Sequence, residues 1–509
     1  MRRDDYRATL IVMFGLAAAT LTGFLRQAVV AHQLGVGHSA DVYLVAFAVP
    51  EFVFIALPTI FSPAFIPLFA ECRLKAGETC AWRFGLRVVG AVLAVLLLLT
   101  ALAGVGAPLY LRWLAPGFGT HERAQALRAT RLMLPAISLM GLATLAGAGL
   151  QVYRRFARPA SATAVYNLVF IVTLLAAPVA WPVGRAAWGV SLGAAGALLL
   201  QLPLLWKHRP ESLAPEDATD CQSLKSLKEF AYLAGPVAAG CAVHHVILFV
   251  DRAMATALGA GSAAALNYAY HLALVVGQLS GLAVSTALFP RLAEQVADGD
   301  AAGTRAALRA ALRFVWMVGL PATCGLIVLR APLVRTLFER GAFDQAATAA
   351  VSGPLAWYGM AVLADALCQP LWRIVYARRS AWTVFAVNGL QTGVRLLANV
   401  ALIPALGYNG LALSAALGLA VQAIVLGVLV RRRLGAYLTG AWWCDVAIVA
   451  LAAVVGALVA RVLTARLSAA PAPVALLVSG TLGGIAYLAA LWSLRQRRGV
   501  YREIETDNG

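Results

Sequence analysis

Charged residues are scarce in this sequence. Only 13% of its 509 residues are Asp, Glu, Lys or Arg, whereas a soluble domain carries about 25%. Hydrophobic residues make up 61%, and the mean hydropathy is +0.79. This balance excludes a water-soluble enzyme and an intrinsically disordered chain. The net charge of +18 suits a nucleic-acid-binding protein, but the basic residues stand in short clusters between apolar runs, which indicates membrane topology instead.

Motifs for nucleotide hydrolysis and metal binding are missing too. No G-x-x-x-x-G-K-[ST] phosphate loop occurs, because none of the four lysines follows a glycine. The histidines lack the spacing of a metal site and are more typical of hydrogen-bond donors between membrane helices. The seven cysteines contain no C-x-x-C pair, so no disulfide framework is expected. The sequence therefore predicts no catalytic residue, cofactor or metal.

Long apolar runs define an all-α polytopic membrane protein. About 20 apolar residues in a helix cross the hydrocarbon core, and helices are expected because lipid leaves backbone amides no other partner. We expect fourteen transmembrane helices, near residues 8–34, 41–70, 84–109, 125–152, 160–181, 186–206, 229–257, 263–290, 308–329, 346–376, 381–404, 409–430, 441–463 and 473–494.

The distribution of basic residues predicts the orientation of these helices. With the N-terminus in the cytoplasm, 28 of the 41 Lys and Arg residues fall on the cytoplasmic side, 11 on the outer side and 2 deeper within spans. This bias favours both termini being cytoplasmic. Asp4 and Asp5 are atypical of a signal peptide, so the first apolar run is expected to be an uncleaved helix.

Two halves of the chain resemble each other. Leu34-Gly35-x-Gly37 and Leu258-Gly259-x-Gly261 each follow an arginine near a helix end, and Phe156-Ala157-Arg158 matches Tyr376-Ala377-Arg378 at nearly the same offset. Six helices per repeat keep both halves in one orientation, which is a transporter architecture. The predicted parts are a first half (1–206), a cytoplasmic linker (207–228), a second half (229–434), two extra helices (435–494) and a cytoplasmic tail (495–509).

Ionisable residues within or at the ends of the predicted spans are the main candidates for function. At mid-bilayer each costs at least about 2.5–3.5 kcal/mol unless it is paired or hydrated. They could line a partly cationic cavity between the halves, or they could lie at helix ends and in helix–helix contacts. The set is Arg26, Asp41, Glu51, Asp251, Arg252, Asp365, Arg395 and Asp445.

The second predicted helix is rich in proline. Each proline removes a backbone hydrogen bond, so four within eighteen residues predict a kinked or broken helix. Such a helix is tolerated where its backbone faces a cavity, and it is either a moving element or a passive kink. The prolines are Pro50, Pro58, Pro63 and Pro67.

Several motifs resemble the MurJ/MviN family, whose members are lipid II flippases of the multidrug/oligosaccharidyl-lipid/polysaccharide exporter superfamily. The resemblance extends over about residues 10–435. It rests on Gly23-Phe24-x-Arg26, Leu34-Gly35-x-Gly37, Asp41, Phe47-x-x-Pro50, Ala64-Phe65-Ile66-Pro67, Leu114-Ala115-Pro116-Gly117-Phe118, Leu266-Asn267-Tyr268-Ala269 and Leu337-Phe338-Glu339-Arg340-Gly341-Ala342-Phe343.

The resemblance implies a substrate and a mechanism. The substrate would be an undecaprenyl-pyrophosphate-linked saccharide, moved from the inner to the outer leaflet of the bacterial cytoplasmic membrane by alternating access. A cationic cavity would hold the head group, and the last two helices would form a groove for the lipid tail. Arg26 is the expected pyrophosphate partner, because guanidinium pairs bidentately with phosphate. The substrate-binding candidates are Arg26, Asp41, Glu51, Arg252 and His271.

This sequence departs from the family pattern at several of these positions. The family usually has Ser-Arg, an acid, a base, Asn, Arg and Arg where this chain has, in order, Ala19-Thr20, Gln27, Ala48, Glu51, Phe54 and His271. A flippase for another polyprenyl-linked glycan therefore stays an alternative to a lipid II flippase.

The sequence also bears on ion coupling and on two other functions. Some members of the family are thought to use an ion gradient, and Asp251 with Asn399 could bind Na⁺ or H⁺, although Arg395 one turn earlier would repel a cation. A polytopic glycosyltransferase is less favoured, because the outer loops are short and carry no acidic pair. A drug exporter of the same superfamily is disfavoured by the Ala115-Pro116-Gly117-Phe118 and Arg340-Gly341-Ala342-Phe343 motifs.

Overall fold

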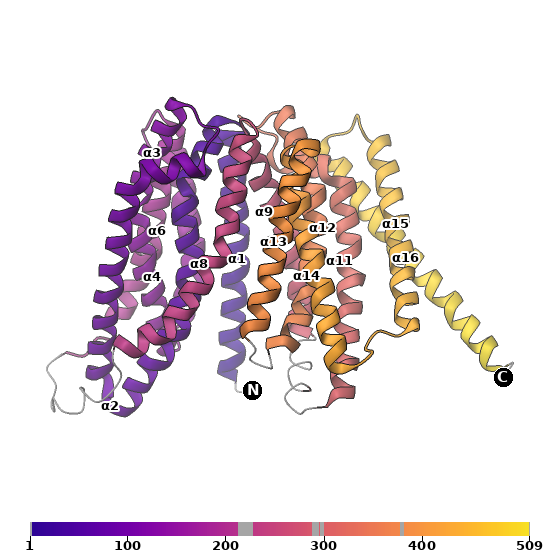
Figure 1. Cartoon of the computed structure of the whole chain (residues 1–509), viewed down its shortest axis with the longest axis horizontal. Helices are drawn as coiled ribbons and strands as arrows, with labels where there is room; N and C mark the ends of the chain where they lie inside the picture. The colour runs from indigo at the N-terminus through magenta and orange to yellow at the C-terminus, as the bar shows by residue number, and fades with distance from the viewer. Residues whose placement is uncertain (1–2, 212–226, 288–294, 296–299, 377–380, 508–509) are drawn as a thin grey trace. The chain divides into compact units, whose positions relative to one another are not determined.

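The computed structural model describes residues 3–211, 227–287, 295, 300–376 and 381–507. These residues form helices joined by short turns, and none of them forms a strand (Figure 1). The predicted all-α fold is therefore confirmed. The chain divides into two compact units, Met1–Ala264 and Ala265–Gly509, and each is described by itself.

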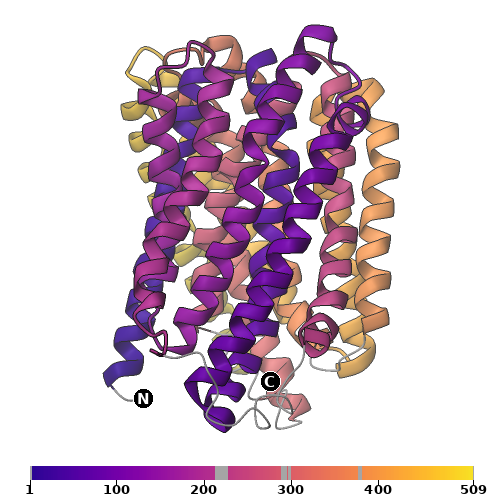
Figure 2. The ribbon, with the colours of Figure 1, turned by 90° about the vertical axis from the view of Figure 1, so that its left-hand side faces the viewer.

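The described part of the first unit contains α1 to α6, α8 and the start of α9. Each of these helices runs between the two ends of the unit, except the short α3 (Figure 2). Their bounds are α1 Arg3–Leu34, α2 His38–Leu114, α3 Thr120–Met133, α4 Pro135–Val152, α5 Ala157–Ala176, α6 Pro182–Trp206 and α8 Leu227–Ala257.

Helix α2 contains two of the predicted spans. Its 77 residues are helical except at Gly77, where φ is 81° and ψ is 175°. Only glycine adopts this conformation without strain. The two arms fold back on each other at this point, so that Phe65 stacks on Phe84 with ring centroids 6.3 Å apart. The arms correspond to the spans predicted at 41–70 and 84–109.

The four prolines of the first arm do not break the helix. The backbone stays helical at all four, and Gly77 is the one non-helical residue inside α2. The fixed φ of proline lies in the helical region, so the backbone can continue through a proline at the loss of one hydrogen bond. Of the two expected outcomes, the broken helix was wrong, and a kinked helix stays a prediction. The prolines are Pro50, Pro58, Pro63 and Pro67.

Small residues bring the helices of the first unit close together. A side chain at Gly141 of α4 would overlap Leu96 of α2, and one at Gly193 of α6 would come within 2.8 Å of the Tyr166 backbone oxygen on α5. Close approach at small residues is the usual way in which membrane helices associate, since lipid provides no hydrophobic drive between them.

The second unit contains the remaining helices. Its last two helices pack against each other and against α11: Tyr487 of α16 donates to the Met317 backbone oxygen (2.7 Å), and Arg313 of α11 pairs with Asp445 of α15 (3.3 Å). The helices are α9 Ser262–Ala287, α11 Ala301–Phe338, α12 Gln345–Tyr376, α13 Ala381–Leu406, α14 Tyr408–Leu434, α15 Gly440–Arg466 and α16 Ala472–Asp507.

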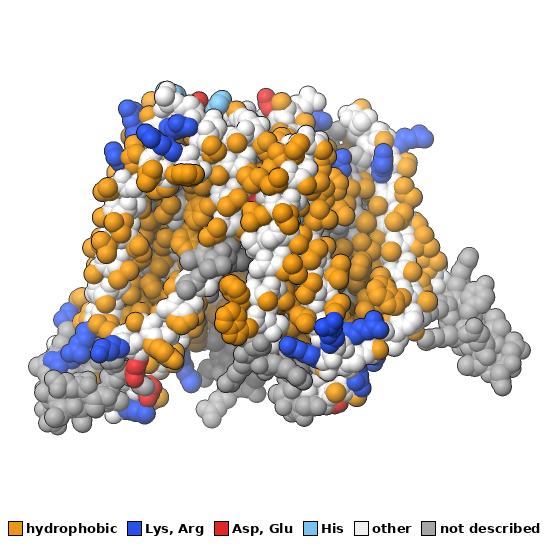
Figure 3. Space-filling view, viewed as in Figure 1, with side chains coloured by type: hydrophobic (Ala, Val, Ile, Leu, Met, Phe, Trp, Pro, Cys, Tyr) orange, Lys and Arg blue, Asp and Glu red, His pale blue; other side chains and the backbone are white. Residues whose placement is uncertain are grey.

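The helices are those of a multi-pass membrane protein. In the described residues, 11 helices are long and apolar enough to cross a membrane, and α2 counts once among them. On the face in Figure 3, hydrophobic side chains cover the middle of the helices and Lys and Arg gather near their ends. The fourteen predicted spans correspond to α1, the two arms of α2, α3 together with α4, and the ten later helices.

The predicted division into two six-helix halves stays a prediction. Along the sequence the first unit ends at Ala264, because α8 packs along α2 within that unit, as in the contact of Phe61 with Phe230 (6.1 Å between ring centroids). Most of the predicted linker (212–226) and residues 377–378 of the repeat motif lie outside the described residues. Cys80 is disulfide-bonded, whereas Cys324, Cys368 and Cys444 are thiols.

Candidate functional site

Arg26 of α1 lies within a group of aromatic rings. Its guanidinium carbon is 6.0 Å from the ring centroid of Phe47, 5.7 Å from that of Tyr166 and 5.5 Å from that of Phe170. Its Nη1 donates a long hydrogen bond to the Tyr166 hydroxyl (3.4 Å). A guanidinium at this distance from a ring face is attracted by the ring quadrupole. Aromatic side chains of α2 and α5 thus hold the Arg26 guanidinium of α1 in position.

The Arg26 guanidinium has a hydrogen-bond donor that no group in the described residues accepts. Its Nε is buried and has no hydrogen-bond partner among the described residues. Arginine stays protonated in proteins and presents five N–H donors in a planar fork. Such a fork binds phosphate through two parallel hydrogen bonds. The arrangement is therefore suited to an anionic ligand with oxygen acceptors.

Two further rings complete the aromatic group around Arg26. Phe54 packs edge-on against Tyr166 with ring centroids 5.6 Å apart and against Phe47 at 6.0 Å, and Tyr43 stacks on Phe47 at 5.7 Å. Phe54 stands where the resemblance leads one to expect arginine. In this chain that position contributes packing to the group rather than a second positive charge.

Glu51 and Arg252 form an ion pair between α2 and α8. Arg252 Nη2 is 2.9 Å from Glu51 Oε2, and its Nη1 donates to the Leu44 backbone oxygen at 2.9 Å. The two side chains are 26% and 16% exposed, so the pair is partly shielded from solvent and stronger than a surface pair. The Glu51 charge also interacts electrostatically with Arg26. Three of the five predicted substrate-binding residues therefore come together in the first unit.

Asp41 is buried, and backbone N–H groups donate hydrogen bonds to both of its carboxylate oxygens. It is 1% exposed, and its Oδ2 accepts from Gly261 N (2.6 Å) while its Oδ1 accepts from Ala264 N (2.8 Å). Ala264 lies in the first turn of α9, whose backbone N–H groups have no intrahelical partner. Both oxygens of Asp41 thus stabilise the turn between α8 and α9.

The remaining predicted site residues are divided between the two units. Asp251 is half-buried on α8 of the first unit, whereas Asn399 of α13 and His271 of α9 belong to the second. Asn399 is fully buried, and its side-chain oxygen accepts a hydrogen bond from the Ser414 hydroxyl of α14. A cation site shared by Asp251 and Asn399 stays a prediction, as does the role of His271. The described residues contain no cluster of three or more His, Cys, Asp and Glu side chains that could hold a metal ion.

The other ionisable candidates contact residues of their own helix or of a neighbouring helix. Asp445 pairs with Arg313 across two helices, as the helix-contact alternative predicts. Asp365 receives a weak hydrogen bond from Gln369 one turn further along α12 (3.4 Å). Arg395 of α13 packs its Cβ close to Gly418 of α14.

Reasoning from the sequence missed the aromatic group. Tyr43 and Phe47 are four residues apart on α2, and Tyr166 and Phe170 are four residues apart on α5. Residues at this spacing lie on one face of a helix. Two aromatic i, i+4 pairs on predicted spans, together with an arginine within another span, were the signal available in the sequence.

The Ala115-Pro116-Gly117-Phe118 motif forms a close backbone contact. A Cβ at Gly117 would overlap the Thr256 carbonyl oxygen near the end of α8, and the Thr256 hydroxyl lies 3.5 Å from the Leu114 backbone oxygen. The glycine therefore allows the loop after α2 to pack directly on α8.

Comparison with known proteins extends these observations. A family model described as "Lipid II flippase MurJ" matches residues 30–477. The lipid II flippase MurJ of Burkholderia cenocepacia is 28% identical over 445 residues, which is 86% of each chain. The probable lipid II flippase MurJ of Rhizobium tropici is 31% identical over 420 residues, 81% of this chain and 78% of the relative.

Solved structures share the fold. A lipid II flippase MurJ in an inward closed conformation superposes with a TM-score of 0.80 at 19% identity, covering 96% of this chain and all (100%) of that chain. An inward-facing multidrug resistance MATE family transporter of the MOP superfamily superposes with a TM-score of 0.67 at 15% identity, covering 82% of this chain and 95% of that chain.

The family model spans most of the chain, from the end of α1 into α16. It covers the turn after α1, the Asp41 contact and the Glu51–Arg252 pair. The resemblance noted in the motifs is thereby confirmed, and the helical fold agrees with it. This chain belongs to the lipid II flippase MurJ family of membrane transporters.

Proposed function

We propose that this protein moves lipid II, an undecaprenyl-pyrophosphate-linked peptidoglycan precursor, across the bacterial cytoplasmic membrane from the inner to the outer leaflet. The observation that carries the proposal, beyond family membership, is Arg26: a permanent positive charge on a membrane-spanning helix, held by aromatic rings, with an unpartnered Nε.

The chemistry of the substrate explains why such a charge is needed. A pyrophosphate cannot enter hydrocarbon without losing its hydration, at a cost that only fixed opposite charge or water can offset. The polyprenyl tail is apolar and can stay in lipid. Arg26 binds the pyrophosphate, and the Glu51–Arg252 pair supplies further donors and acceptors for the head group. Asp41, whose oxygens are both occupied by backbone N–H groups, acts by positioning the α8–α9 turn.

The internal repeat and the charge bias support the rest of the mechanism. Two like-oriented six-helix halves, with His271 contributed by the second half, suit alternating access. Both termini lie in the cytoplasm, as the excess of Lys and Arg in the intervening segments indicates. The undecaprenyl tail lies along α15 and α16, where a cavity of about 370 Å³ is lined by Leu488, Leu491, Trp492, Arg495 and Gln496.

Transport is coupled to a cation gradient through Asp251 and Asn399. A carboxylate and an amide oxygen are suitable ligands for Na⁺, and a carboxylate alone is sufficient for H⁺. This part of the proposal rests on the residue types and their positions in the sequence.

Complementation tests the proposal. The full chain is expressed in bacteria whose own lipid II flippase is depleted, with membrane insertion checked by immunoblotting. Growth is expected for the natural chain, loss of growth for Arg26→Ala, and partial growth for Arg26→Lys, which keeps the charge but loses the planar fork. Arg112→Ala is the matched control, because Arg112 is exposed at the end of α2.

Two outcomes would contradict the proposal at different points. Failure of the inserted natural chain to support growth would reject lipid II and favour another polyprenyl-linked glycan. Full growth with inserted Arg26→Ala would leave lipid II as the substrate but remove Arg26 from the mechanism.

A further inference from the structure

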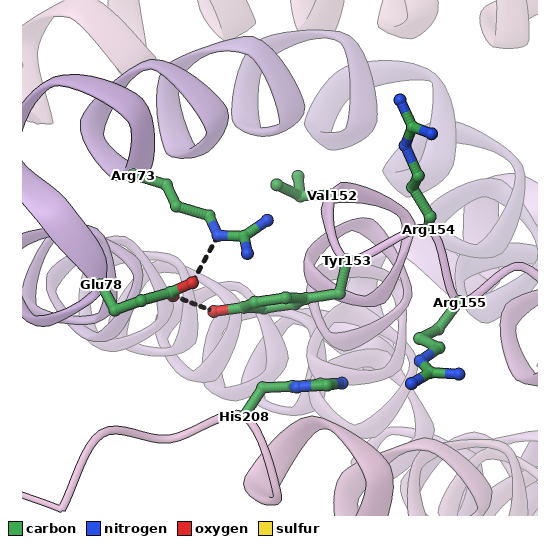
Figure 4. Close-up of a pocket in the computed structure, with 7 residues that line it drawn as sticks. All are labelled: Arg73, Glu78, Val152, Tyr153, Arg154, Arg155 and His208. Atoms are coloured by element: carbon green, nitrogen blue, oxygen red, sulfur yellow. Dashed lines mark hydrogen bonds and ion pairs between the residues drawn. The ribbon is translucent and has the colours of Figure 1, made fainter.

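A second basic site lies at one end of the first unit, away from Arg26. A cavity of about 440 Å³ opens where the arms of α2 reverse, at the same end of the unit as the start of α1 (Figures 1 and 2). The end of α4 and the segment after α6 form its other walls. The cavity is lined by Arg73, Glu78, Val152, Tyr153, Arg154, Arg155 and His208 (Figure 4).

The single acidic side chain of the cavity is already neutralised. Arg73 Nε pairs with Oε1 of Glu78, and the Tyr153 hydroxyl donates to Oε2 at 2.7 Å. Burial, followed by the hydrogen bond to Glu78, raises the pKa of the Tyr153 phenol, so the phenol stays protonated and acts as a donor. Trp82 Nε1 donates to the same hydroxyl at 2.9 Å. Each Glu78 oxygen therefore already accepts a hydrogen bond, and the Glu78 charge is balanced by Arg73.

The Tyr153 ring is held between two nitrogen-containing groups. The Arg73 guanidinium carbon is 4.5 Å from its centroid, and the His208 ring stacks on it at 4.4 Å with an interplanar angle of 10°. Figure 4 shows Arg73 on one side of the ring and His208 on the other. Arg73 and His208 hold the Tyr153 ring from its two faces, so this wall of the cavity is preorganised.

Among the described residues, no carboxylate balances the remaining positive charges of the cavity. Arg154 and Arg155 form the turn after α4, in which Arg154 has φ 56° and is the one non-glycine residue with positive φ in the described part of the chain. Their backbone N–H groups bond to Gln151 and Leu150, but neither guanidinium has a carboxylate partner among the described residues. Strained backbone of this kind is concentrated at functional sites.

The imidazole ring of His208 adds to the cavity a nitrogen that can form a hydrogen bond and has no partner among the described residues. Its Nε2 is buried and has no hydrogen-bond partner among the described residues. In Figure 4 the guanidinium of Arg155 extends toward the nitrogen-bearing end of the His208 ring. The positive charges of the exposed Arg154 and Arg155 and an imidazole nitrogen without a partner among the described residues thus line one cavity, which is large enough for a phosphate group.

We propose that this cavity binds a phosphate group, contributed by an anionic phospholipid head group or by a soluble phosphate. Arg155 provides a bidentate contact, His208 Nε2 a further hydrogen bond, and Arg154 additional positive charge. The neutral Glu78–Arg73–Tyr153 wall positions His208. The site is separate from Arg26 and does not depend on the transported substrate.

Binding measurements on the full-length protein separate the two sources of phosphate. Inorganic pyrophosphate is titrated by calorimetry into detergent-solubilised protein that carries Arg26→Ala in every variant, so that Arg26 does not bind the probe. In parallel, protein in phosphatidylcholine nanodiscs with or without phosphatidylglycerol is analysed for retained lipid by native mass spectrometry. The test variant is Arg154→Ala/Arg155→Ala. The matched control is Arg461→Ala/Arg466→Ala, which removes the same charge from exposed positions of α15.

The test variant is expected to weaken binding of one probe by about tenfold or more, while the control variant binds like the natural protein. Loss of pyrophosphate binding identifies a soluble phosphate, and loss of phosphatidylglycerol retention identifies a lipid head group. Equal binding by the test variant and the natural protein for both probes, or equal losses in the test and control variants, would overturn the proposal. If the double variant does not fold, Arg155→Gln alone serves the same comparison.

Discussion

The Asp41 carboxylate of α2 accepts the backbone N–H of Gly261, 220 residues further along the chain, at 2.6 Å. Gly261 has φ +82°, and a Cβ there would lie 3.0 Å from a Val36 methyl group and 3.2 Å from Gly37 N. The two Leu-Gly-x-Gly motifs of the repeat therefore pack against each other. Asp41, four residues after the first motif, fixes the second.

Replacement of Asp41 by asparagine should destabilise this contact. Asparagine offers one acceptor oxygen where two buried N–H groups need a partner, so we expect a loss of about 1–3 kcal/mol. The measurement is thermal unfolding in detergent. Asp300→Asn is the control, because the Asp300 side chain caps α11 at an exposed position through one hydrogen bond. A melting shift for Asp41→Asn no larger than that of the control would contradict this role.

Gly117→Ala should also destabilise the protein, for a steric reason. The new methyl group would overlap the Thr256 carbonyl oxygen, and overpacking of this kind costs about 1–3 kcal/mol. The comparison is Gly90→Ala, since a Cβ at Gly90 meets nothing within 4 Å. Thermal unfolding of both variants measures the difference. Equal stability of the two variants would show that the loop can move away from α8.

The Glu51–Arg252 pair should show measurable coupling. A double-mutant cycle with Glu51→Gln and Arg252→Gln, followed by unfolding, is expected to give an interaction energy of about 1–3 kcal/mol, because the pair is partly buried and joins two helices. The Glu71–Lys75 pair is its control, with 2.8 Å between charged atoms on an exposed helix face. Pairs of that kind contribute about 0.3–0.5 kcal/mol. Similar coupling in both cycles would remove the structural basis for the proposed role of Glu51.

Asp251→Asn tests ion coupling. The variant keeps an oxygen ligand but loses the negative charge that attracts a cation. Flipping of lipid II by protein in proteoliposomes should therefore lose its dependence on an imposed Na⁺ or proton gradient. Asp365→Asn controls for removal of an acidic residue from a membrane helix. Gradient dependence that persists in Asp251→Asn would reject this residue as the coupling site.

Much of the fold could be predicted because hydrophobic length is a local property. A run of about 20 apolar residues must be helical in lipid wherever it packs, so the spans could be counted before any contact was known. The prolines of α2 were less informative. Their effect on the helix depends on whether neighbouring groups accommodate the lost hydrogen bonds, whereas the actual reversal occurs at Gly77, an isolated glycine without a distinctive pattern.

The sequence by itself determined the membrane-spanning helices and the family, because these depend on composition, periodicity and motifs along the chain. Only the tertiary structure decided the partners of the charged residues. It places Arg26 among aromatic rings from two other helices and pairs Glu51 with Arg252. Both carboxylate oxygens of Asp41 accept hydrogen bonds from backbone N–H groups. The physical reason is that the function of a buried charge depends on the groups within a few ångströms of it, and most of these come from distant parts of the chain.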